Sequence, residues 1–96
     1  MFIGNYEEEL TKCDLVAKSG APYTITLVAG ELRKHGRDRD GRETEIPCTH
    51  GVRIDGVTSR HEWNFVNKRE ACDYFGRQLA EKLYNGYRFK WFLFAD

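Results

Sequence analysis

The sequence predicts an α+β fold, in which one helix packs across an antiparallel sheet of about four to five strands in the order β-β-β-β-α-β. Two patterns predict it. Segments that alternate apolar and polar residues, separated by turn residues, occur before residue 66 and again after residue 86. Between them, apolar residues recur every four positions, as they do on one face of a helix. A chain of 96 residues has room for one such domain, residues 1–96.

Two alternating segments predict a first hairpin. Residues from about 8 to 17 form its first strand, and residues 23–29, which are rich in β-branched side chains, form its second. The glycine and the proline within residues 18–22 favour a turn between the strands, because glycine accepts unusual backbone angles and proline fixes its own.

The middle of the chain is predicted to hold a charged loop and a second hairpin. Residues 33–42 contain two glycines and no apolar side chain, which favours an exposed, mobile loop. Residues 43–48 follow as a short edge strand, because Pro47 cannot donate a hydrogen bond within a central ladder. The pair Asp55-Gly56 then predicts a tight two-residue turn with a strand on either side.

The helix is predicted from its caps and its apolar stripe. Asn67 can cap its first turn, and Glu70 three residues later completes a capping box. Asn85-Gly86 ends it in the left-handed geometry that glycine tolerates. The stripe that faces the sheet consists of Ala71, Phe75, Leu79 and Leu83.

A last strand is predicted at residues 87–94, where apolar and polar side chains alternate. One face carries Tyr87, Phe89 and Trp91, which are expected to pack beneath the helix. The strand is also the expected sheet edge for pairing with a second copy of the chain.

Composition and charge argue against several classes of protein. Fifteen basic residues balance fifteen acidic ones, which disfavours an acidic DNA mimic and a histone-like binder. We expect neither a membrane span nor a signal peptide, because apolar runs are short. Cysteine occurs three times, an odd number that disfavours a disulfide framework, so the cytoplasm is the predicted location.

The segment from residue 50 to residue 87 resembles the WGR domain. Its first part, His50-Gly51-Val52-Arg53-Ile54-Asp55-Gly56, resembles the Trp-Gly-Arg-Ile-Gly strand and turn that give the family its name. Its second part, from Asn67 to Tyr87, resembles the family's helix. WGR domains are small nucleic-acid-associated modules of poly(ADP-ribose) polymerases and bacterial regulators. The resemblance implies nucleic-acid binding, with Arg53 in the role of the signature arginine, while His50 stands where the family has tryptophan.

Metal binding and covalent catalysis are not predicted. Cys48 and His50 lie close in sequence, but their spacing does not match the paired ligands of structural zinc sites. They could also form a thiolate–imidazole pair, but the neighbouring Pro47 indicates a simple edge strand. Phosphate-binding glycine loops do not occur in the sequence. We therefore expect no metal, no other cofactor and no enzymatic activity.

The basic residues of the middle third give the first functional hypothesis. Residues 32–60 carry seven basic and five acidic residues. Arginine suits phosphate, because its planar fork donates two parallel hydrogen bonds. We expect a noncatalytic nucleic-acid-binding module that contacts the phosphate backbone through Arg33, Lys34, Arg37, Arg39, Arg42, Arg53 and Arg60. Acidic residues are interleaved with these side chains, so a merely solvated loop stays open as an alternative.

A protein-binding module, such as a phage-encoded inhibitor of a host enzyme, is the second hypothesis. Phe92 and Phe94 fall on the other face of the last strand, where they form either a second small cluster or an exposed patch. The acidic run Glu7, Glu8 and Glu9 offers a surface for a basic partner. The sequence leaves the class of partner and the oligomeric state open.

Overall fold

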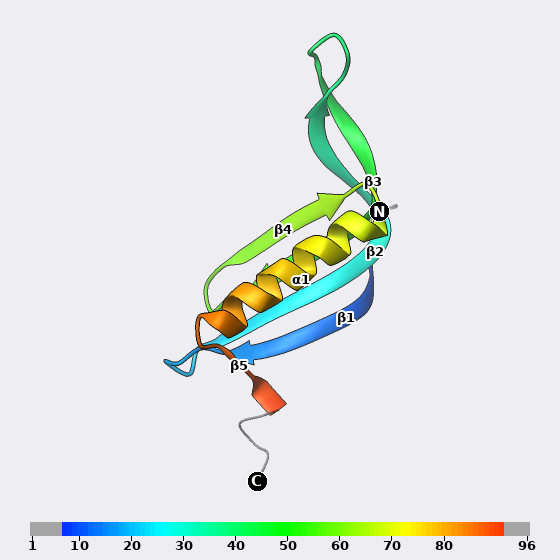
Figure 1. The fold of residues 1–96 in the computed structure, drawn as a ribbon. Helices are drawn as coiled ribbons and strands as arrows, with labels where there is room; N and C mark the ends of the chain where they lie inside the picture. Colours follow the sequence, from blue (N-terminus) through cyan, green and yellow to red (C-terminus); the bar gives the residue numbers. More distant parts are fainter. Residues whose placement is uncertain (1–6, 92–96) are drawn as a thin grey trace.

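The computed structural model describes residues 7–91 and contains one sheet and one helix (Figure 1). The strands are β1 (Glu7–Val16), β2 (Pro22–Arg37), β3 (Glu43–Asp55), β4 (Arg60–Phe65) and β5 (Arg88–Phe89), and the helix is α1 (Lys68–Tyr84). Neighbouring strands are antiparallel, in the spatial order β4-β3-β2-β1-β5. The α+β fold and the chain order β-β-β-β-α-β are therefore confirmed.

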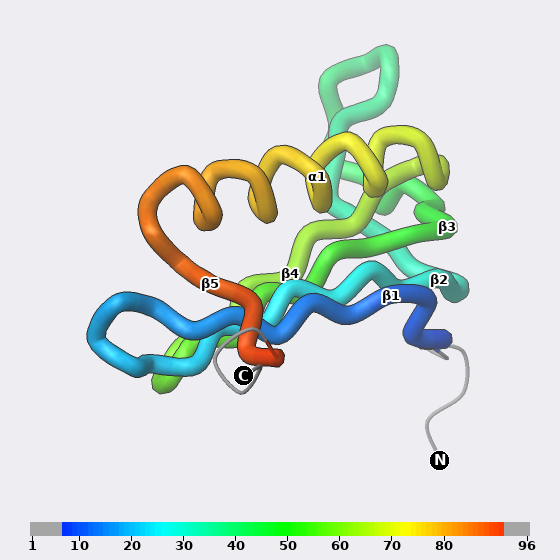
Figure 2. The backbone as a smooth tube through the Cα atoms, turned by 60° about the horizontal axis from the view of Figure 1, so that its bottom comes forward, coloured from blue at the N-terminus to red at the C-terminus, as the bar shows by residue number. Residues whose placement is uncertain are grey.

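The helix α1 lies across one face of the sheet, as Figures 1 and 2 show from two directions. The buried cluster between the two layers consists of Leu15, Ile25, Leu27, Val52, Ile54 and Ala71. Partly buried side chains pack against it, among them Tyr23, Phe65, Tyr74, Phe75, Leu79 and Tyr87. Burying one large aliphatic side chain contributes roughly 1.5–3 kcal/mol, so this face of the sheet holds the domain together.

Both ends of α1 have the caps that the sequence predicts. The side chain of Asn67 accepts a hydrogen bond from the backbone N–H of Glu70 at 2.9 Å. At the other end Gly86 adopts φ +95°, a conformation that side-chain-bearing residues rarely take. The following N–H of Tyr87 donates to the carbonyl of Lys82 at 3.0 Å. These bonds satisfy terminal backbone groups of the helix and turn the chain back toward β5.

The strands β2 and β3 continue beyond the rest of the sheet and form a two-stranded arm, residues 32–48 (Figure 1). Their pairing runs from Leu32 opposite Cys48 to Arg37 opposite Glu43. A register shift in β2 just before Leu32 marks the point where the arm leaves the sheet. Such an irregularity bends and twists a strand, and the arm accordingly projects away from the body of the molecule (Figures 1 and 2).

Two predictions for this segment were wrong: the mobile loop predicted at 33–42 is shorter, and the edge strand predicted at 43–48 is part of a longer strand. Residues 33–37 belong to β2, and residues 43–48 are the first part of the long strand β3. Only residues 38–42 connect the two strands. An arm of two strands has little apolar surface to bury, so its sequence lacks the apolar alternation by which strands are recognised.

The turn at the tip of the arm is built around Asp38. Its carboxylate accepts hydrogen bonds from the backbone N–H groups of Asp40 at 2.9 Å and Arg42 at 3.0 Å. Gly41 adopts φ +78°, and its N–H donates to the Asp38 carbonyl at 3.1 Å. A turn closed by a left-handed glycine is a common hairpin connection. The pattern Asp-Arg-Asp-Gly is compatible with such a turn, but it does not by itself identify the paired strands on either side.

The connection between β3 and β4 is longer than the two-residue turn predicted at Asp55-Gly56. The ladder ends with Asp55 opposite Arg60, so residues 56–59 form the connection. It is closed by a hydrogen bond of 2.9 Å from the Gly56 N–H to the carbonyl of Ser59.

The last strand is also shorter than predicted within the described residues. β5 contains only Arg88 and Phe89, which pair with the end of β1. Because the ladder stops there, Trp91 does not continue the buried face as expected: it is 66% exposed and stacks on Phe89 at a centroid distance of 5.7 Å. The predicted positions of Phe92 and Phe94 lie outside the described residues.

Candidate nucleic-acid interface

One face of the arm carries charged side chains from both strands. Arg37 lies opposite Glu43, and His35 lies opposite Glu45. Arg33 forms an ion pair with Glu45 across the strands, with 3.8 Å between the nitrogen and oxygen atoms. Both side chains of this pair are mostly exposed, and an exposed ion pair is worth only about 0–1 kcal/mol. It can therefore open at low cost when an anion competes for the arginine.

The tip of the arm presents two arginines, Arg39 and Arg42. Both are exposed, and neither side chain has a hydrogen bond or an ion pair with any described residue. The neighbouring Arg37 instead donates from Nη1 to the carbonyl of Gly41 at 2.8 Å and braces the turn. Arg39 and Arg42 are thus the arginines of the arm that are available to a partner.

Lys34 lies on the other face of the arm and is half-buried. On that face Ile46 covers Gly36 so closely that a Cβ at Gly36 would overlap the Cδ1 atom of Ile46. The basic residues predicted in this segment therefore divide between two faces and the tip, with Arg33 and Arg37 on one face and Lys34 on the other.

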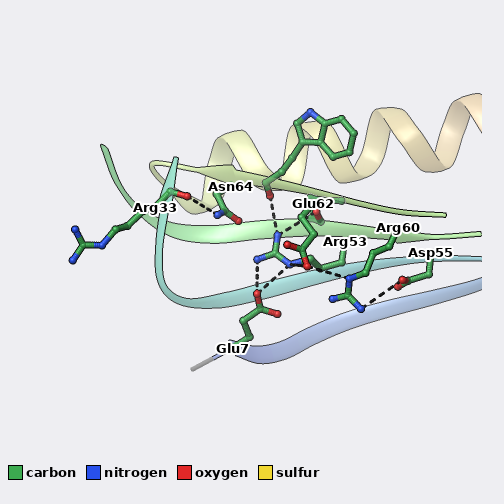
Figure 3. Close-up of polar contacts among 9 residues, drawn as sticks. Glu7, Arg33, Arg53, Asp55, Arg60, Glu62 and Asn64 are labelled. Carbon is green, nitrogen blue, oxygen red and sulfur yellow. Dashed lines mark hydrogen bonds and ion pairs between the residues drawn. The ribbon is translucent and has the colours of Figure 1, made fainter. Parts of the chain in front are cut away.

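Arg53, the residue that the WGR resemblance singles out, is buried and forms hydrogen bonds within the protein. It lies in the middle of the sheet face opposite α1, which we call the open face, and is only 3% exposed. Its Nε donates to Glu7 Oε1 at 3.1 Å, and its Nη2 donates to the same oxygen (Figure 3). Its Nη1 donates to the carbonyl of Trp63 at 3.2 Å. This guanidinium is therefore used inside the protein, and its contact with phosphate stays a prediction.

Arg60 is also engaged on the open face, although it is exposed. Its Nε donates to Glu62 Oε1 at 3.0 Å, and its Nη1 lies 3.6 Å from Asp55 Oδ1 (Figure 3). A concavity of about 240 Å³ covers this region, and its lining includes the basic residues Lys12, Arg53 and Arg60 and the acidic residues Glu7, Glu9 and Asp55. The lining of this concavity therefore carries three basic and three acidic residues.

Asn64, which the sequence did not single out, ties the arm to the sheet. It comes from β4, and its Nδ2 donates to the backbone carbonyl of Arg33 at 2.7 Å (Figure 3). Its Oδ1 is buried and has no hydrogen-bond partner among the described residues. A single polar residue in an alternating strand carries no sign of such a contact, so sequence patterns could not identify it.

The structure places only some of the residues predicted for a protein-binding surface. Glu7 is held by Arg53, whereas Glu8 and Glu9 are exposed on β1. Phe92 and Phe94 lie outside the described residues, so no aromatic patch involving them can be placed beside this acidic run.

The cysteine and histidine considered for catalysis or metal binding lie at the base of the arm. Cys48 is buried, and its Sγ donates to the carbonyl of Ile46 at 3.5 Å. Burial raises the pKa of this thiol; Lys34 lowers the pKa and Glu70 raises it, both by smaller amounts. The His50 Nδ1 lies 2.8 Å from the hydroxyl of Thr49. Within residues 7–91, no three histidine, cysteine or acidic side chains gather as metal ligands.

We expect the three cysteines to differ in their rates of alkylation. Cys72 is exposed and should react first with iodoacetamide, whereas Cys48 is buried with a raised pKa and should react last, at least about tenfold more slowly, because the thiolate is the nucleophile. Cys13 is half-buried, and its pKa is raised by burial and by Asp14, so it should be intermediate. Peptide mass spectrometry at successive times measures the order. Equal rates in the folded protein would contradict it, and urea-unfolded protein is the control.

Comparison of the chain with protein-family models, curated proteins and solved structures finds no match. The likeness to the WGR domain therefore remains a prediction from residues 50–87. Within residues 7–91, α1 falls short of the length and apolar character that a membrane-spanning helix needs. The geometry of the arm is accordingly the main basis for a functional proposal.

Proposed function

We propose that this protein is a noncatalytic nucleic-acid-binding module that contacts the phosphate backbone through its arm. The observation that carries the proposal is the position of Arg39 and Arg42: both are exposed at the tip of a projecting hairpin and have no side-chain partner among the described residues. A planar guanidinium without an internal partner can offer both of its parallel N–H donors to a phosphate.

The remaining basic residues of the arm support the tip. Arg33 is held only by an exposed ion pair with Glu45, and Lys34 offers a point charge on the opposite face. Asp38 has a structural role at the tip, because one of its carboxylate oxygens accepts hydrogen bonds from two backbone N–H groups. Arg53 and Arg60 are left out of the proposed interface, since both are engaged by acidic partners on the open face.

Replacing both tip arginines, in R39Q/R42Q, is expected to weaken binding to a nucleic acid about tenfold or more at low salt. Each lost phosphate contact should also lower the slope of log K against log salt by about 0.9. Fluorescence anisotropy of a labelled oligonucleotide at several salt concentrations measures both effects. Glutamine is shorter than arginine but stays polar and removes the charge, and neither arginine side chain contributes to the turn, so the fold should be unaffected.

The matched control removes the same charge elsewhere. In K18Q/R77Q, both changes lie on exposed residues away from the arm, one in the β1–β2 turn and one on α1. The proposal requires this variant to keep nearly the affinity and salt slope of the unchanged protein. Equal losses in the two double variants would show that only net charge matters, and would overturn the arm as the interface.

The substitution D40N tests the same site in the opposite direction. The Asp40 backbone N–H takes part in the turn, but its exposed carboxylate accepts no hydrogen bond from a described residue. Removing this negative charge beside Arg39 should strengthen binding, whereas a protein partner with a basic surface would be bound more weakly. Failure of the unchanged protein to bind any nucleic acid at low salt would refute the proposal and favour the protein-binding hypothesis.

A further inference from the structure

We infer that the nucleic acid taken by the arm is duplex DNA in the B form, with the arm entering the major groove. This inference rests on the proposed function and specifies its substrate class. Three features carry it: the dimensions of the arm, the absence of aromatic residues from the arm, and the distribution of its basic side chains.

The arm has the cross-section of a two-stranded β-ribbon. Paired strands lie about 4.8 Å apart, and a ribbon of this kind fits the major groove of B-form DNA, which is about 12 Å wide and 8.5 Å deep. The ladder from Leu32 opposite Cys48 to Arg37 opposite Glu43 covers six residues of β2, or about 20 Å at 3.3 Å per residue. The arm is therefore long enough for its tip to reach the floor of the groove while the body stays outside.

The arm is prepared for insertion before any ligand binds. Its tip is closed by the hydrogen bonds to Asp38, and its base is tied to β4 by the bond from Asn64 to the Arg33 carbonyl. Ordering a flexible loop on binding would oppose association, because each backbone residue that becomes fixed loses conformational entropy. A preformed ribbon avoids most of this cost.

Single-stranded nucleic acid is a poor fit to the same surface. Proteins that hold single strands combine positive charge with aromatic rings on which bases stack. Residues 32–48 contain no phenylalanine, tyrosine or tryptophan. The most exposed rings among the described residues, Tyr84 and Trp91, lie at the end of α1 and after β5, not on the arm.

Double-stranded RNA is disfavoured by groove shape. The major groove of A-form RNA is deep and narrow and excludes protein elements, and its wide minor groove is shallow. A projecting ribbon therefore has a groove to enter in B-form DNA and none in A-form RNA.

The basic side chains are placed for a ligand that surrounds the ribbon. Arg33 and Arg37 lie on one face, Lys34 lies on the other, and Arg39 and Arg42 are at the tip. A flat surface would meet only one of these groups at a time. The two phosphate ridges that flank a groove meet both faces of an inserted ribbon, which accounts for basic residues on both.

The test compares three labelled ligands of one sequence: a 20-base-pair DNA duplex, its single strand and the corresponding RNA duplex. Anisotropy titrations at low salt should show the DNA duplex bound at least about tenfold more tightly than the other two, and R39Q/R42Q should lose most of that preference. Equal or tighter binding of the single strand or the RNA duplex overturns this inference and leaves the proposed function standing. Binding of none of the three refutes both.

Groove occupancy is tested by methylation of guanine N7, which faces the major groove. With the unchanged protein bound, dimethyl sulfate should methylate guanines of the DNA duplex severalfold more slowly, and R39Q/R42Q at the same concentration should restore the rate. Tight duplex binding without protection of N7 overturns insertion into the major groove. Circular dichroism of the variant confirms that its fold is intact, so that a loss of protection reports the tip itself.

Discussion

Replacing Arg53 by alanine is expected to destabilise the protein by about 2–4 kcal/mol. Arg53 is buried in the open face and donates to Glu7 and to the carbonyl of Trp63. Alanine removes all of these bonds and leaves a void at the centre of the sheet. Because Glu7 is partly exposed, water can solvate its carboxylate after the change. The loss of stability should therefore be smaller than for a fully buried ion pair.

Urea denaturation followed by circular dichroism measures this effect. The matched control is Arg60→Ala, which removes an arginine of the same face that is 55% exposed, and its effect should stay within about 0.5 kcal/mol. Arg53→Lys should lie between the two, since lysine keeps the charge and loses the fork. If Arg53→Ala lowers the free energy of unfolding by less than about 0.5 kcal/mol, as a typical surface change does, a structural role for Arg53 is contradicted. Folded Arg53→Ala should bind DNA as the unchanged protein does.

The substitution Gly51→Ala is expected to destabilise the protein by about 1–3 kcal/mol. A Cβ at this position would lie 2.6 Å from Arg53 Nη1, 2.7 Å from Asn64 Oδ1 and 3.0 Å from the carbonyl oxygen of Trp63. Two of these groups belong to side chains fixed by hydrogen bonds, and the third is backbone, so none can move freely. Gly51 is thus the residue whose lack of a side chain makes room for Arg53.

The control for this change is Gly76→Ala on α1. A Cβ there meets nothing within 4 Å, and alanine is favoured over glycine inside a helix by about 0.5–1 kcal/mol, so Gly76→Ala should raise the urea midpoint. A double-mutant cycle completes the test: Gly51→Ala should cost less in the Arg53→Ala background, because one of its three close contacts is gone. Strict additivity would show that the crowding around Gly51 does not involve Arg53.

The helix could be predicted almost entirely because its determinants are local. The cap at Asn67, most of the apolar stripe and the glycine at position 86 lie within one stretch of chain, although Leu83, predicted to face the sheet, is 37% exposed and lies outside the core cluster. The first hairpin was predictable for the same reason, since residues with alternating polarity flank an evident turn. Both predictions needed no knowledge of what packs against the element.

The arm and the role of Arg53 could not be predicted because each depends on distant residues. The strand at residues 33–37 shows no apolar alternation, and its pairing with β3 is visible only in the structure. Arg53 looks like any surface arginine in sequence, yet its partner Glu7 is 46 positions away. Burial of a charge is decided by such a partner, and local composition does not reveal it.

The pairing of β2 with β3 in the arm also determines by which steps the length of the arm can change. Outside the sheet only β2 and β3 run side by side, so residues can be removed from both strands without opening the core cluster under α1. Removing one residue from each strand would turn every side chain nearer the tip to the opposite face, because side chains alternate along a strand. Removing two from each keeps the faces and shortens the arm by about 6.6 Å. The length of the arm can therefore be changed in steps of two residues per strand without exchanging its faces.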